Sequence, residues 1–391
     1  YATGSDNTFV GFQAGRGGTS SAPFSSGQYN TAVGYQALTA FTVGDHTTAI
    51  GYQAGKAQVD GYDNTYIGAR SGQANAVGDG NVTLGDRALY SDTSGHRTIA
   101  IGKDALHNFS GSGTTTFNSD ITKIIAIGYH AAYYMGSVPG GSYPNATRST
   151  NNIAIGYHAA QTHYAGGSNV VIGTEALKGI GNHAQASVHI GESSGQNVAS
   201  GSYNVAVGAY THRYATGSYN TFVGYKAGVG GTTSAPFSSG TNNTAVGYEA
   251  LKRFTSGQEN TALGKGALAF VTTGGSNIGI GLSAGGNTTT ATGNTYIGRS
   301  TGYGNQSGIE NVIIGEYSYA HTTGIVNFRN VTTLGSNAGR YATGSYNTFL
   351  GSYAGYGTNT SAPFNKGEYN TFVGYHAGKE FTTASNLTLL G

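Results

Sequence analysis

Two histidines at one repeated position are the residues whose spacing is best suited to chemistry. His130 and His158 each follow the segment Ile-Ala-Ile-Gly-Tyr. Stacked copies of that segment would place the two imidazoles about 4.8 Å apart, where they could hold an anion or a metal ion. Other copies carry unrelated polar residues at this position, which favours a solvated polar row without a metal. Those residues are Gln13, Gln36, Gln53, Arg70, Asp104, Glu175, Lys226 and Glu249.

Catalytic patterns are missing from the sequence. The 17 acidic residues are scattered singly, whereas glycosidic chemistry would need a cluster of carboxylates or bases. There is no His-Glu-x-x-His, no phosphate loop ending in Gly-Lys-Ser/Thr, and no Gly-x-Ser-x-Gly elbow between a strand and a helix. We therefore expect no enzyme activity, no catalytic residue, no cofactor and no bound metal.

Tyrosines gather beside turn-forming residues in one long insertion. Tyr133, Tyr134 and Tyr143 lie in a stretch rich in Gly, Ser, Pro and Asn. Exposed tyrosine with small polar neighbours suits adaptable recognition and stacking on sugars. These three tyrosines are our candidate receptor contacts. The alternative is a glycine-rich excursion that packs on an adjacent protomer.

A longer repeat is superimposed on the short one, with copies starting near residues 1, 214 and 341. Each copy contains Ser-Ala-Pro-Phe, so Phe24, Phe237 and Phe364 would lie in the inserted loops 16–27, 229–240 and 355–367. Such a tip could dock laterally or touch a ligand. Alternatively, each phenylalanine folds back over its own corner. Two larger inserted loops cover 103–127 and 129–155.

All these residues are carried by a short repeat. In 21 places Val, Ile or Leu precedes a glycine, and the commonest spacing between those glycines is 17 residues. A fixed period of this kind is typical of stacked coils. Two residues before the aliphatic residue stands a β-branched one, while the residue between them varies. This alternation predicts a short strand whose first and third side chains point inward and whose middle one points outward.

Small residues mark a corner in each repeat. Ala, Ser or Thr stands three residues after the glycine in all 20 copies that extend so far. A position restricted to small side chains predicts a close approach of backbones, and the glycine permits the bend before it. The residues of two copies illustrate this predicted structural core of the repeat. They are Val33, Gly34 and Ala37, and Val246, Gly247 and Ala250.

The predicted fold is all-β: one continuous parallel β-solenoid over residues 1–391, with about 21 coils. One aliphatic, one β-branched and one small inward side chain make a thin core for each coil. We therefore expect a second face to be buried against other chains, most simply in a parallel homotrimer.

Three segments also resemble known repeats. Asn30–Ala37, Asn152–Ala159 and Asn204–Gly208 are similar to the head repeats of trimeric autotransporter adhesins, and more so to repeats of bacteriophage tail-fibre shafts and related secreted proteins. The resemblance covers essentially all 391 residues and implies a left-handed β-roll in an intertwined homotrimeric fibre. Longer coils, aromatic residues after the glycine and inserted loops favour the phage-fibre relatives. The resemblance concerns architecture and does not indicate a ligand.

Composition favours an extracellular location. Charged residues make up 9% of the chain, against a usual level of about 25%, and there is no cysteine. A net charge of +2 without basic clusters argues against nucleic acid as a partner. No apolar stretch approaches the ~20 residues of a membrane span, so we expect no membrane insertion. The chain opens in mid-repeat, as a piece of a longer polypeptide would.

The expected function is that of a non-enzymatic extracellular fibre or adhesin shaft, on a virion, a cell surface or a secreted filament. It would present an attachment surface to a cell-surface glycan or protein receptor. The alternative is a structural subunit that joins end to end into an extracellular filament or matrix. A third hypothesis is an ice- or glycan-binding solenoid with a flat row of threonines. The inward position predicted for those threonines argues against it.

Overall fold

The computed structural model describes residues 2–18, 25–109, 123–135, 150–163, 166–179, 184–198, 200–231, 238–320, 326–357 and 365–391. Over these residues the chain is a parallel β-solenoid with a base period of about 17 residues, and 21 coils each contribute one strand of three residues. This confirms the all-β solenoid predicted from the repeat. The chain forms two compact units, Tyr1–Tyr203 and Asn204–Gly391.

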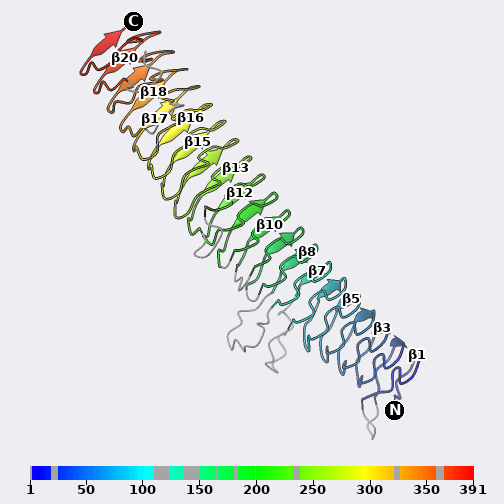
Figure 1. Cartoon of the computed structure of the whole chain (residues 1–391). Helices are drawn as coiled ribbons and strands as arrows, with labels where there is room; N and C mark the ends of the chain where they lie inside the picture. Colours follow the sequence, from blue (N-terminus) through cyan, green and yellow to red (C-terminus); the bar gives the residue numbers. More distant parts are fainter. Residues whose placement is uncertain are drawn as a thin grey trace. The chain divides into compact units, whose positions relative to one another are not determined.

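The strands of the first unit pair in parallel and in register, β1 to β9 each with the strand of the next coil (Figure 1). Thr8 is opposite Thr31, for example, and Val10 is opposite Val33. The strands are β1 (Thr8–Val10), β2 (Thr31–Val33), β3 (Thr48–Ile50), β4 (Thr65–Ile67), β5 (Val82–Leu84), β6 (Ile99–Ile101), β7 (Ile125–Ile127), β8 (Ile153–Ile155), β9 (Val170–Ile172) and β10 (Val188–Ile190).

The second unit is built in the same way, with parallel, in-register pairing from its first strand to its last. Its strands are β11 (Val205–Val207), β12 (Thr221–Val223), β13 (Thr244–Val246), β14 (Thr261–Leu263), β15 (Ile278–Ile280), β16 (Thr295–Ile297), β17 (Val312–Ile314), β18 (Thr332–Leu334), β19 (Thr348–Leu350), β20 (Thr371–Val373) and β21 (Thr388–Leu390).

The side chains of the strands point the opposite way from our prediction. In β2 the middle residue Ala32 is buried, whereas Val33 is only partly buried, and β13 repeats this with Ala245 and Val246. The middle residue is buried in every strand from β2 to β20. Alternation shows that the two sides of a strand differ, but the direction of the turn after the glycine decides which side is enclosed. Here the chain returns over the middle residue, so the aliphatic row faces outward.

The glycine after most strands is required by the close stacking of the coils. Gly34 has a φ of 132°, and a Cβ there would lie 2.5 Å from the carbonyl oxygen of Gly51. Gly247 has a φ of 133°, and its Cβ would lie 2.7 Å from the carbonyl of Gly264. Any side chain would therefore collide with the next coil. The corner residues Ala37 and Ala250 that follow are fully buried.

Several coils fill their core mainly from one of two positions, the middle of the strand or a site six residues later. In the β12 coil, Phe222 is large and the later residue is Gly228, whose Cβ would lie 2.5 Å from the Phe222 ring. In the β13 coil, Ala245 is small and the later residue is Leu251. Gly228 and Leu251 share a left-handed backbone, with φ of 54° and 49°. In these two coils the positions are therefore complementary in volume.

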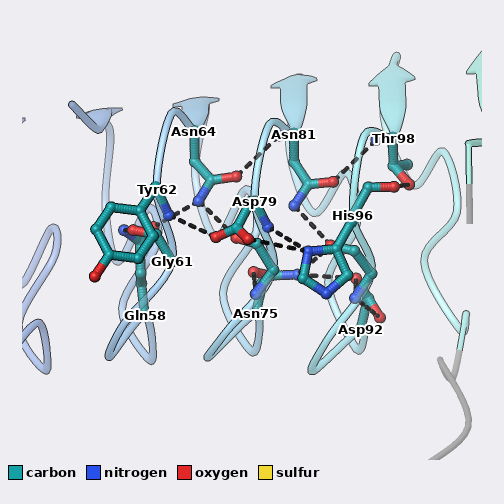
Figure 2. Close-up of polar contacts among 12 residues, drawn as sticks. Gln58, Gly61, Tyr62, Asn64, Asn75, Asp79, Asn81, Asp92, His96 and Thr98 are labelled. Carbon is teal, nitrogen blue, oxygen red and sulfur yellow. Dashed lines mark hydrogen bonds and ion pairs between the residues drawn. The ribbon is translucent and has the colours of Figure 1, made fainter. Parts of the chain in front are cut away.

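Buried asparagines connect the coils at the start of the strands (Figure 2). The Asn64 side-chain amide donates to the Gly78 carbonyl (2.7 Å), and its Oδ1 accepts from the backbone N–H of Asn81 (2.9 Å). Asn81 repeats both bonds with Gly95 and Thr98 (2.8 and 3.0 Å). The same position is occupied by a buried asparagine in many other coils of both units. They are Asn30, Asn152, Asn169, Asn204, Asn220, Asn243, Asn260, Asn277, Asn294, Asn311, Asn347 and Asn370.

Candidate functional site

Histidines and tyrosines form one continuous cluster on the first unit, which we call the His/Tyr patch. It lies on the turns that follow β5 to β8, where the coils are in register. Its members are Arg87, Tyr90, Asp104, His107, Tyr129, His130, Tyr133, Tyr157 and His158.

The two histidines predicted to share a row do stack. The ring centroids of His130 and His158 are 5.2 Å apart with an interplanar angle of 14°. Each imidazole also stacks on the tyrosine that precedes it in the sequence. The ring centroids are 4.0 Å apart for Tyr129 and His130 and 3.9 Å apart for Tyr157 and His158. This confirms the predicted stack.

Tyr133 and Tyr134, two of our candidate receptor contacts, are half-buried at the edge of the patch. The Tyr133 ring stacks on His107 at 5.0 Å and contacts His130 at 4.4 Å, while Tyr134 meets Tyr133 edge-on at 4.7 Å. Tyr143, the third candidate, lies outside the described residues. The structure therefore brings two of these tyrosines together with the imidazoles.

A buried carboxylate lies at the centre of the patch. Asp104 is only 3% exposed, and both of its oxygens face Arg87, with Oδ1 3.0 Å from Nε and Oδ2 3.1 Å from Nη2. His107 Nε2 is 3.7 Å from Oδ1, and His130 Nε2 is 3.5 Å from Oδ2. One acid thus faces one guanidinium and two imidazoles. The prediction that this row is fully solvated was wrong for Asp104, because the stacked rings cover it.

The far end of the patch carries an ion pair, whose lysine faces His158. Lys178 Nζ donates to His158 Nδ1 at 3.3 Å and pairs with Glu175 Oε1 at 2.7 Å. Gln196 donates in turn to Glu175 Oε2 at 2.8 Å. His130 therefore faces an acid, whereas His158 faces a cation.

Burial sets the protonation of the patch. It lowers the pKa of His107 and of His130, although the Asp104 carboxylate opposes the shift in both. Burial also lowers the pKa of His158, and Lys178 and His130 add to that effect. The pKa of Tyr133 is raised by burial and by Tyr134. The imidazoles are therefore neutral at pH 7.

Sequence analysis singled out Tyr133 but missed Tyr90 and His107 as members of the patch. Tyr90, His107 and Tyr133 stack in a column, with centroids 4.8 and 5.0 Å apart. Each stands five residues after its glycine, and Lys178 occupies the same position in the β9 coil. This shared repeat position could have been used to predict that the side chains stack.

Aromatic rings also stack outside the patch. Phe12, Tyr35 and Tyr52 stack at 5.3 and 5.5 Å, and the guanidinium of Arg70 lies over the last ring at 5.6 Å. Beside them, Gln36 donates to Gln13 at 2.9 Å.

Phe24, Phe237 and Phe364 lie outside the described residues. The residue just after each phenylalanine accepts the same backbone hydrogen bond in the three copies of the long repeat. The backbone N–H of Thr3 donates to Ser25, that of Thr216 to Ser238 and that of Thr343 to Asn365. The bases of these three loops therefore have one geometry.

Within the described ranges, no three His, Cys, Asp or Glu side chains come together as a metal site would require. The same ranges contain no helix that is long and apolar enough to cross a bilayer.

Comparison with protein-family models, curated proteins and solved structures finds no match to this chain. Its function therefore has to be argued from the solenoid and its surfaces.

Proposed function

We propose that this chain is a shaft segment of an extracellular fibre and that it works as a parallel homotrimer. The outward aliphatic row of the strands carries this proposal. Leu84, Leu263 and Leu334 are 47%, 46% and 53% exposed, although each is the third residue of a paired strand. Large apolar side chains that recur on one sheet face are typical of a surface that another protein covers.

A second copy of the chain is the partner that best fits this face. The row repeats once per coil at about 4.8 Å, so a parallel copy presents the same spacing along its length. Three such faces around a common axis form a closed core without an exposed sheet surface. The resemblance to tail-fibre and adhesin repeats supports the same arrangement.

The His/Tyr patch is the proposed attachment surface. It combines exposed Tyr129 and Tyr157 with half-buried Tyr133 and Tyr134, and Tyr143 follows these residues in the sequence. Aromatic rings beside charged and amide groups suit a glycan or a protein receptor. The proposed role is non-enzymatic and involves neither nucleic acid nor membrane insertion.

Sedimentation equilibrium tests the assembly. Discrete trimers support the fibre shaft, whereas open-ended polymers support the alternative, a filament or matrix subunit. Leu84→Lys and Leu263→Lys should dissociate the trimer, because they place charges in the proposed core. Thr174→Lys adds the same charge at an exposed position outside the strands and should leave the trimer intact. A monomeric parent chain would refute the proposal.

A second candidate gains support from the corrected orientation. Thr221, Thr244 and Thr261, the first residues of β12, β13 and β14, lie on the outward face with cross-strand pairing. The argument against an ice- or glycan-binding surface was that such threonines point inward, and that argument no longer holds. Thermal hysteresis by the parent chain, lost in Thr244→Lys, would favour ice binding over the shaft.

A further inference from the structure

The stacked pair His130 and His158 has opposite surroundings at its two ends. His130 Nε2 is 3.5 Å from Asp104 Oδ2, and the neighbouring ring His107 faces the same carboxylate. His158 Nδ1 accepts a hydrogen bond from Lys178 Nζ at 3.3 Å, and this bond assigns the ring proton to Nε2. The pair thus has an acid on one side and a cation on the other.

The charged groups around the pair determine how many protons it can hold. From the earlier coils, His130 faces Asp104, Arg87 and His107, while its own coil adds Tyr129 and Tyr133. A proton on His130 is stabilised because the imidazolium then pairs with the Asp104 carboxylate. The stack can therefore accept a first proton without rearrangement.

A second proton has no stable place in the stack. His158 faces Lys178 and Glu175 from the β9 coil, His130 and Tyr129 from the β7 coil and Tyr157 from its own. The proton would have to bind Nδ1, the acceptor of the Lys178 bond, so that two donors would then face each other. It would also place two imidazolium rings 5.2 Å apart. Both conflicts persist for as long as the His158 ring stays in the stack.

We propose that the His130–His158 stack is an acid-operated cover: at mildly acidic pH the second protonation drives the His158 ring out of the stack and uncovers the ring of Tyr157. His158 lies against that ring at 3.9 Å with an interplanar angle of 18°. Its departure opens an aromatic surface suited to stacking with a sugar or a planar ligand. The step follows from the geometry of the patch and does not depend on trimer formation.

Hydroxyl-radical footprinting with mass spectrometry tests the proposal on the intact chain. Between about pH 7.5 and about pH 4.5, oxidation of Tyr157 should rise about twofold, because a ring face becomes accessible. Tyr35 and Tyr52, which stack without histidine, should not change. Tyr375 should not change either, because its stacked His376 contacts Tyr353 instead of a lysine.

Variants identify the group responsible. His158→Gln cannot take up the proton and should abolish the pH dependence of Tyr157 oxidation. Lys178→Met removes the facing cation and should reduce the acid-induced rise. A rise in His158→Gln equal to that of the parent chain would overturn the proposal. So would a rise shared by Tyr35 and Tyr52, which would indicate general unfolding, or constant Tyr157 oxidation in the parent chain.

Discussion

The ring of Phe222 occupies the space where a side chain at Gly228 would lie. A Cβ at Gly228 would be 2.5 Å from that ring, and one coil later the same volume is filled by Leu251 above the small Ala245. Large and small side chains thus exchange places within a fixed backbone. This relationship leads directly to the first prediction.

Moving the large side chain of the β12 coil from position 222 to position 228 should keep the core of the coil packed. Phe222→Ala alone should cost about 3–5 kcal/mol of unfolding free energy through the cavity that it leaves. The double variant Phe222→Ala with Gly228→Leu copies the Ala245 and Leu251 arrangement and should recover a large part of that loss. Thermal unfolding measures both. A double variant less stable than Phe222→Ala would show that the two positions are not complementary.

The buried corner should not accept a larger side chain. Ala37→Leu or Ala250→Leu should lower stability by about 1–3 kcal/mol, because the backbones of consecutive turns meet there. Thr174→Leu introduces the same side chain at an exposed site and serves as the control in the same melting experiment. An unchanged melting temperature in both corner variants would refute the assignment of the corner.

Removing one asparagine between coils should also be costly. The Asn260 amide donates to the Gly274 carbonyl at 3.0 Å, and its Oδ1 accepts from the backbone N–H of Asn277 at 3.1 Å. Asn260→Ala leaves both partners buried and unpaired, with an expected loss of about 2 kcal/mol or more. Asn287→Ala, at a partly exposed position, is the matched control. Equal denaturant midpoints for the two variants would contradict the role of Asn260.

Acid should destabilise the second unit through His212. Burial lowers the pKa of this residue to about 3 from 6.5, so the unfolded chain takes up a proton that the folded chain refuses. Above pH 6.5 the neutral histidine leaves the free energy of unfolding at its full value. Below pH 6.5 the free energy of unfolding falls as the pH falls toward 3. The loss should be on the order of 4 kcal/mol.

The His212→Leu variant isolates that effect. Leu251 occupies the equivalent position in the β13 coil with nearly the same φ, 49° against 50°, so leucine fits the backbone at this position. Urea unfolding at a series of pH values should show a smaller acid loss in the variant. Parallel pH curves for the two proteins would rule out His212 as the source.

The period, the glycines and the small corner residues were enough to predict the coil. What they could not predict was the enclosed side of the strand, because Val33 and Ala32 are both apolar and only the turn after Gly34 distinguishes them. The buried asparagines, in contrast, could have been recognised from a pattern in the sequence. Asn stands four residues before the repeat glycine in most copies, as at Asn64 and Asn81.

The candidate site was predicted in part. The shared repeat position of His130 and His158 was sufficient to predict their stacking. The role of Asp104 was missed because unlike residues in one row were each treated as solvated. A parallel, in-register stack makes them neighbours instead, so an acid beside a histidine becomes a pair.

The asparagine bonds recur in most coils, and this has an evolutionary consequence. Where two adjacent coils both carry the asparagine, a duplication or deletion of one 17-residue stretch leaves a coil beside a neighbour that offers the same donors and acceptors. Length can therefore change in steps of about 4.8 Å without a new fold having to be invented. Selection can adjust the reach of such a molecule almost independently of what its surface recognises.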